Sequence, residues 1–87
     1  MQIGQSDLRS LAVFRSVVEH GSFAGAQISL GLSQSAVSFH IKALEDRFGF
    51  ALCRRGRSGF ELTHRGSVLY ERSNALYRPL NPFESDI

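Results

Sequence analysis

Residues 22–48 contain two segments with helical spacing, separated by a break of only three residues, GLS. The first segment follows Ser22 and the second follows Ser33, and serine favours the N-cap because its hydroxyl accepts a hydrogen bond from a first-turn amide. Gly31 and Gly49 stand just past the two ends, where helices commonly terminate. The spacing therefore predicts a helix-turn-helix made of helices 23–30 and 34–48.

The second of these helices has two unlike faces. Its apolar residues stand at i, i+4, i+7 and i+11, a stripe that we expect to face the core: Val37, Ile41, Leu44 and Phe48. The opposite face near the N-terminus carries Gln34, Ser35, Ser38, Phe39 and Lys42. This outward face is neither strongly charged nor uniformly apolar.

Apolar residues also recur at three- and four-residue steps before this motif. They are Leu8, Leu11, Phe14, Val17 and Val18. With Ser6 or Asp7 as the N-cap and Gly21 as the break, this pattern predicts a helix from about residue 7 to residue 20.

After the helix-turn-helix the pattern changes to FALCRRGRSGFEL, with a glycine- and arginine-rich middle. We predict a two-stranded hairpin that pairs residues 51–54 with residues 60–62 around RGRSG. Thr63 is then the N-cap of a last helix, bounded by Pro79 and Pro82.

The predicted fold class is mainly α, a winged helix-turn-helix with a three-helix core and a two-stranded wing, followed by a long linker helix. We expect residues 1–62 to form the winged helix-turn-helix, residues 63–80 the last helix, and residues 81–87 a tail or the start of a linker. The resemblance described below implies that the last helix is a linker and dimerisation helix. A chain of 87 residues can bury one modest core, which makes an enzyme with its own substrate pocket improbable.

The net charge is only +2, but the positive charge is locally concentrated. Residues 53–66 hold four arginines against the single acid Glu61: Arg54, Arg55, Arg57 and Arg65. The single cysteine, Cys53, fits a reducing compartment, and the sequence shows neither a signal peptide nor a membrane span. We therefore expect a cytoplasmic protein with no membrane partner.

The outward face of residues 34–42 suits the major groove of DNA. Gln34 can pair with adenine or bond a phosphate, and the serines let the backbone come close. Phe39 could lie against thymine methyl groups, while Lys42 suits a phosphate or guanine. The alternative is that these residues form an ordinary solvent-exposed face, and the residues of this helix alone do not decide between the two. The arginines of the hairpin favour DNA, through phosphate contact or minor-groove insertion, although a solubilising loop would look similar.

Catalytic and metal chemistry find little support in the sequence. The possible metal ligands are not spaced as metal sites require: His20, His40, His64 and Cys53. The sequence also contains no nucleophile elbow and no glycine-rich phosphate loop. We predict no catalytic residue, no metal site and no cofactor. Cys53 is best explained as a small buried hydrophobe, although the neighbouring arginines could activate its thiol.

Several motifs of the sequence occur in the order that is typical of a known protein family. GSF, LSQSAVSFHIKALE, GFALCRR and LTHRG occur in this order within a match that covers the chain from about Leu8 to about Tyr77. The series resembles the N-terminal winged helix-turn-helix domain of LysR-type transcriptional regulators. The resemblance implies a bacterial-type transcription regulator that binds double-stranded DNA.

The resemblance also implies roles for individual residues. Base and backbone contacts fall to Gln34, Ser35, Ser38 and Phe39, and phosphate contacts to Lys42 and the wing arginine Arg55, with Thr63 near the DNA backbone. The linker helix pairs two domains in this family, which makes Leu69, Tyr70, Leu76 and Tyr77 candidates for a homodimer seam. Packing of these four within the chain is the alternative, and the sequence does not separate the two. A dimer implies an interrupted inverted repeat as its DNA site.

The sequence departs from the family pattern in places. Phe39 replaces a basic or polar residue, Ser35 a proline, Gln27 an alanine and Cys53 a phenylalanine. The family's large effector-binding domain is absent from these 87 residues, so we expect a small-molecule effector to act only through such a C-terminal domain. A protein-interaction winged helix without DNA binding of its own is the alternative function.

Overall fold

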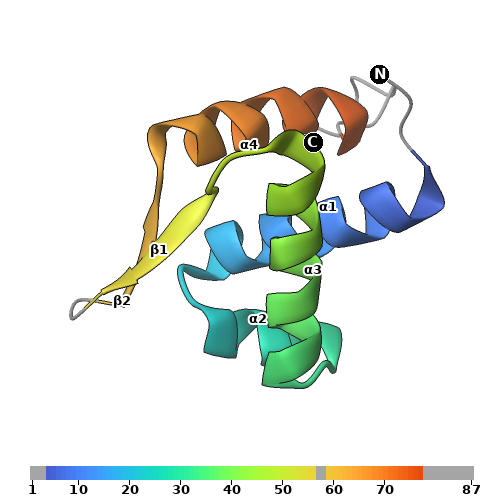
Figure 1. The fold of residues 1–87 in the computed structure, drawn as a ribbon. Coiled ribbons are helices and arrows are strands. Elements are labelled where there is room, and N and C mark those ends of the chain that lie inside the picture. The colour runs from blue at the N-terminus through green and yellow to red at the C-terminus, as the bar shows by residue number, and fades with distance from the viewer. Residues whose placement is uncertain (1–3, 57–58, 78–87) are drawn as a thin grey trace, which may run out of the picture.

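The computed structural model describes residues 4–56 and 59–77 and has the order of elements that the sequence predicts. Its helices and strands are α1 (Gln5–His20), α2 (Phe23–Leu30), α3 (Gln34–Phe48), β1 (Cys53–Gly56), β2 (Gly59–Leu62) and α4 (His64–Tyr77). Helix α3 crosses α1 with α2 beside it, the wing projects to one side, and α4 lies across the end of the molecule opposite the start of α3 (Figure 1). The mainly helical winged helix-turn-helix is therefore confirmed.

The caps of the helix-turn-helix are those that the sequence indicates. The Ser22 hydroxyl accepts from the Gly25 amide at 2.9 Å, and the Ser33 hydroxyl accepts from the Ala36 amide at 3.1 Å. Gly31 ends α2 in the left-handed conformation with φ 67°, which glycine adopts without a Cβ penalty. The turn between α2 and α3 is thus fixed by local hydrogen bonds and one backbone conformation.

The start of α1 differs from the prediction. The helix begins at Gln5 with Gly4 as its N-cap residue, so the proposed caps Ser6 and Asp7 lie inside its first turn. Asp7 still serves this end, because its carboxylate accepts a hydrogen bond from the Gly4 amide at 3.1 Å. An acidic side chain in a helix's first turn also interacts favourably with the helix dipole.

The core lies where α1, α2 and α3 meet and continues under the start of the wing. Its buried hydrophobic residues are Leu11, Val13, Phe14, Val17, Ala26, Val37, Ile41, Leu44 and Leu52. Leu8, from the predicted apolar stripe of the first helix, and Leu30, the last residue of α2, lie at the surface and are 40% and 39% exposed. Both stand near a helix end, where fewer neighbouring elements cover the apolar stripe.

The wing strands are shifted relative to the prediction, with β1 at Cys53–Gly56 instead of residues 51–54 and β2 starting one residue earlier, at Gly59. Cys53 pairs with Leu62 and Gly56 with Gly59, so β1 begins two residues later than the expected Ala51. Ala51 and Leu52 are held by other partners: the Ala51 carbonyl accepts from the Thr63 hydroxyl, and the Leu52 amide donates to Glu45. These contacts fix the residues that lead into the wing, so the pairing of the two strands starts only at Cys53.

Helix α4 starts at a close crossing with the chain that enters the wing. Thr63 caps it as predicted, since its hydroxyl accepts from the Gly66 amide at 2.9 Å. The Thr63 amide also donates to the Leu52 carbonyl at 3.0 Å. Gly66 is buried there, and a Cβ at this position would collide with the Leu52 carbonyl oxygen. The LTHRG motif therefore has a structural role, because its threonine and glycine let α4 lie directly on the Leu52 backbone.

Candidate nucleic-acid interface

Helix α3 presents its outward face as the sequence predicts. Val37, Ile41 and Leu44 are at most 4% exposed and hold the helix on the core. Among the residues of the opposite face, one is half-buried, Ser38, and four are exposed: Gln34, Ser35, Phe39 and Lys42. The structure thus brings all five residues together on one helix surface.

This surface carries hydrogen-bonding groups but little net charge. Gln34 and Ser35 occupy the first turn, next to amides that have no partner within the helix. Lys42 forms an exposed ion pair with Asp46, with 3.1 Å between Nζ and Oδ1. An exposed pair of this kind contributes little to stability, which leaves the lysine able to exchange its partner for a phosphate.

His40 connects the outward face to α1, a role that we did not predict from the sequence. Its Nδ1 lies 2.9 Å from the hydroxyl of Ser10, a residue only 5% exposed. Its ring also meets the Phe39 ring edge-on, with centroids 5.5 Å apart and planes at 75°. The helical spacing contained a usable signal, because residue 40 directly precedes the buried Ile41 and lies at the edge of the core stripe.

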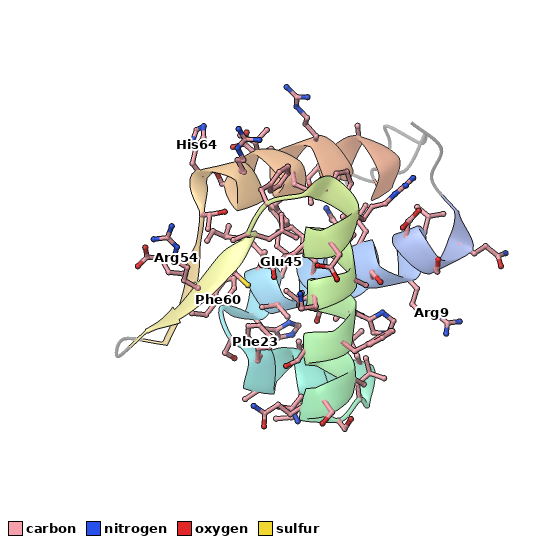
Figure 2. All side chains as sticks on the ribbon, in the orientation of Figure 1. Arg9, Phe23, Glu45, Arg54, Phe60 and His64 are labelled. Carbon is pink, nitrogen blue, oxygen red and sulfur yellow. The ribbon has the colours of Figure 1, made fainter. Side chains whose placement is uncertain are left out.

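The surface of α3 continues towards the wing. A hollow of about 350 Å³ is lined by residues at the start of α2, at the start of α3 and in the wing: Ser22, Phe23, Ala24, Gln27, Gln34, Gly59 and Phe60. Phe23 and Phe60 form an edge contact across the join of α2 and β2, with ring centroids 6.1 Å apart (Figure 2). This contact holds the wing against the helix-turn-helix, so that the two form one surface.

A second, smaller hollow of about 210 Å³ lies between α3 and the base of the wing, lined by Phe23, Ser38, Ile41, Lys42, Glu45 and Cys53. Cys53 was predicted to be a small buried hydrophobe; it packs against the core but is only half-buried. The Glu45 carboxylate accepts from the Leu52 amide at 2.8 Å (Figure 2). This bond fixes the base of the wing to α3 and was missed, because it needs a contact across seven residues and a turn.

The structure describes the wing arginines only in part. Arg54 is exposed, stands opposite Glu61 in the strand register and projects away from the helices (Figure 2). Arg57 and the side chain of Arg55 lie outside the described part of the chain. Arg65, the fourth arginine of the cluster, lies with its guanidinium 5.1 Å from the centre of the Phe50 ring. The cluster is therefore divided between the wing and the first turn of α4.

The candidate dimer residues separate into two pairs. Leu69 and Tyr70 are half-buried and pack against the core of their own chain. The Tyr70 hydroxyl donates a hydrogen bond to the Glu19 carboxylate at 3.2 Å. The pKa of Tyr70 is raised above its ordinary value of 10.0, mainly by burial and to a smaller extent by the negative charge of Glu19. The side chains of Leu76 and Tyr77, in the last turn of α4, lie outside the described residues.

Arg15 is a further residue that we did not predict from the sequence, and it holds α4 on α1. Its guanidinium donates to the Ser73 hydroxyl at 2.9 Å and to Asn74 Oδ1 at 2.6 Å. It also lies 5.2 Å from the centre of the Tyr70 ring, within the range of a cation–π interaction. The separation of the partners by nearly sixty residues hid this contact, because no local pattern marks it.

Metal-ligating clusters and membrane-spanning helices are absent from the described residues. Within 4–56 and 59–77, no group of three or more His, Cys, Asp or Glu side chains is arranged to hold a metal ion. In the same part of the chain, no helix combines the length and apolar character that spanning a bilayer requires. The groups that this surface offers to a ligand are the hydrogen-bonding side chains on α3 and the exposed arginine of the neighbouring hairpin.

This arrangement of helices and hairpin occurs in known proteins that are similar in sequence and structure. The family described as bacterial regulatory helix-turn-helix protein, lysR family, matches residues 8–67. The HTH-type transcriptional activator BauR of Pseudomonas aeruginosa is 43% identical over 86 residues, which are 99% of this chain and 28% of that protein. The chain thus spans little more than a quarter of this relative's length.

The solved structures of similar proteins include complexes with DNA. The CbnR DBD–DNA complex superposes with a TM-score of 0.74 at 33% identity, covering 79% of each chain. The BenM DBD complex with catB site 1 DNA superposes with a TM-score of 0.76 at 34% identity, covering 80% of this chain and 79% of that one. With the family match over residues 8–67, these likenesses show that the chain belongs to the LysR family of bacterial helix-turn-helix regulators.

Proposed function

We propose that this chain binds double-stranded DNA sequence-specifically, as the DNA-binding domain of a LysR-type transcription regulator. The observation that carries the proposal is the outward face of α3, where exposed amide and hydroxyl side chains stand on a helix held by its opposite face. A helix presented by a preceding helix and a tight turn fits the major groove and reads base edges there. The structural likeness to the CbnR and BenM domains in their DNA complexes supports the same conclusion.

The α3 residues divide into those that would read bases and those that would contact phosphate. Gln34, Ser35 and Ser38 would approach base edges or the nearby backbone from the first turns of α3, and Phe39 would contact a base. Lys42, farther along the helix, would reach a phosphate. The α3 N-terminus adds backbone amides and the positive end of the helix dipole to this surface.

The wing would lie along the DNA backbone or enter the minor groove beside α3. Its three arginines would supply cationic groups there: Arg54, Arg55 and Arg57. The hollow between α2, α3 and β2 would receive a phosphate group of one DNA strand between the helix and the wing. Thr63 would act mainly as a positioning residue, because its hydroxyl already donates to the Ala51 carbonyl and accepts from the Gly66 amide.

The organisation of the whole protein is part of the proposal. Residues 1–62 would form the DNA-binding unit, residues 63–80 the linker helix, and residues 81–87 the start of the connection to an effector-binding domain. Two chains would pair through the linker helix, with Leu76 and Tyr77 as the stronger seam candidates, because Leu69 and Tyr70 already pack within the chain. Such a cytoplasmic dimer would bind an interrupted inverted repeat.

The salt dependence of binding to duplex DNA tests this function. Removal of one phosphate contact should reduce the slope of log K against log salt concentration by about 0.9. We expect Arg54→Ala to weaken binding to all duplexes and to flatten this slope by about one contact. Arg72→Ala removes an exposed arginine from α4 and is the matched control, which should leave the slope unchanged.

Two results would contradict the proposal. If the wild-type chain bound duplex DNA no better than a protein of equal charge, the interaction-module alternative would be favoured. If Arg54→Ala and Arg72→Ala changed affinity and slope equally, the wing would have no special place on the phosphates.

A further inference from the structure

We propose that Phe39 reads the 5-methyl group of a pyrimidine in the major groove, so that thymine and 5-methylcytosine are equivalent ligands at one position of the DNA site. This inference rests on the proposed function and specifies one part of it. Its starting observation is that Phe39 is 68% exposed on the outward face of α3, where Ser35 and Lys42 are its polar neighbours one turn away. A single exposed ring is ordinary on a protein surface, but this one stands on the face proposed to meet the base edges, where a ligand can cover its apolar surface.

The position of Phe39 on α3 suits contact with a base edge. Helical side chains lean towards the N-terminus, so the Phe39 ring extends over the turn that contains Ser35, four residues earlier. Ser35 is small and exposed and leaves that ring uncovered. The ring therefore stands next to Ser35, one of the first-turn residues proposed to approach base edges.

The ring is also held in place by its neighbour. His40 meets it edge-on, and His40 is itself fixed by the contact between its Nδ1 and the buried Ser10 hydroxyl of α1. A side chain that is ordered before binding loses less conformational entropy when it binds. Phe39 is thus supported for contact with a rigid partner rather than left to move freely over the surface.

Base chemistry then identifies the ligand. A phenyl ring neither donates nor accepts a conventional hydrogen bond, so it cannot recognise the amino, carbonyl or ring-nitrogen groups of the major groove. The apolar group on this edge is the 5-methyl group of thymine. Cytosine that is methylated at C5 presents the same methyl at the same ring position, so the proposed contact does not depend on which pyrimidine carries it.

The test uses a duplex that the chain enriches from a random library, resynthesised with one base changed at a time. Thymine→uracil removes only the methyl group, and cytosine→5-methylcytosine adds only that group. Burial of one methyl corresponds to roughly a fourfold change in affinity. We expect one position in each half-site where uracil weakens wild-type binding about fourfold and 5-methylcytosine binds about fourfold better than cytosine.

Variants assign the effect to the ring. Phe39→Ala should abolish both methyl effects at that position, and it should keep the fold because the side chain is largely exposed. Ile28→Ala is the matched control, since Ile28 is 84% exposed on α2, outside the α3 face, and this variant should retain both effects. Equal methyl effects in the wild type and Phe39→Ala, or none in the wild type, would overturn the inference while leaving specific DNA binding intact. If no duplex were enriched, the proposed function would fail first, and this inference with it.

Discussion

Gly66→Ala tests whether α4 is placed by direct contact with the backbone that leads into the wing. The new Cβ would collide with the Leu52 carbonyl oxygen and would lie 2.9 Å from its carbonyl carbon. That carbon–carbon separation is at least ~0.6 Å below the usual contact distance of about 3.5 Å. Because the Leu52 carbonyl also accepts the Thr63 amide, it cannot move away without loss of that hydrogen bond.

The expected magnitude follows from two opposing effects. Overpacking a filled site costs about 1–3 kcal/mol, with the upper end expected here because the clash is with backbone. Alanine is better than glycine in a helix interior by about 1 kcal/mol; because Gly66 lies in the first turn of α4, this is the upper limit of the effect that offsets part of the cost. We therefore expect Gly66→Ala to lower the free energy of unfolding by about 1–2 kcal/mol, and Tm by roughly 4–16 °C for a domain of this size.

Thermal unfolding followed by circular dichroism measures this effect. Glu71→Ala, at an exposed position of the same helix, is the control and should change Tm little. A Gly66→Ala protein as stable as the wild type, or more stable, would show that α4 does not depend on the close crossing at Leu52, and the reasoning would be refuted.

Three further predictions concern the attachment of α4 and the turn before α3. Arg15→Ala removes the guanidinium bonds to α4 and should lower the free energy of unfolding by about 2 kcal/mol, with faster amide hydrogen exchange in α4 than in α3. Ser33→Ala removes the N-cap of α3 and should cost about 1 kcal/mol in chemical denaturation. The raised pKa of Tyr70 means that the folded state holds its phenolic proton more tightly than the unfolded state, so stability should fall as pH rises above about 10. Tyr70→Phe should lack that part of the alkaline loss in a urea-denaturation series, and an identical pH profile would contradict the assignment.

The local features of the fold were predictable from the sequence. Ser22, Ser33 and Thr63 cap the helices that they were predicted to cap, because an N-cap needs only a hydroxyl and an amide a few residues away. The buried stripe of α3 was equally clear, since helical spacing fixes which residues share a face.

Apart from the N-cap of α1, where Gly4 takes the place predicted for Ser6 or Asp7, the features that were missed depend on contacts between distant residues. Arg15 meets Ser73 and Asn74 across nearly sixty residues, and Gly66 is required only because Leu52 passes beneath it. The predicted start of β1 was wrong for the same reason: Leu52 looks like strand sequence, but its amide is taken by Glu45. Sequence periodicity holds no information on such pairings.

The candidate site shows the same division. Its α3 residues could be grouped on one face from spacing alone, whereas the support of Phe39 by His40 and Ser10 required the packing of α3 on α1. For the four candidate dimer residues, spacing along the helix could not distinguish a dimer interface from packing within the chain. The structure does so for Leu69 and Tyr70, which pack against the core of their own chain.

The most direct test of the central claim is a selection from random duplex DNA with the purified chain at near-physiological salt, with the enriched sequence and the number of chains per duplex both measured. We predict an interrupted inverted repeat, bound by two chains, whose enrichment changes at specific base pairs in Gln34→Ala. Absence of any enriched sequence, with only weak binding that Gln34→Ala leaves unaltered, would contradict the claim that α3 reads DNA.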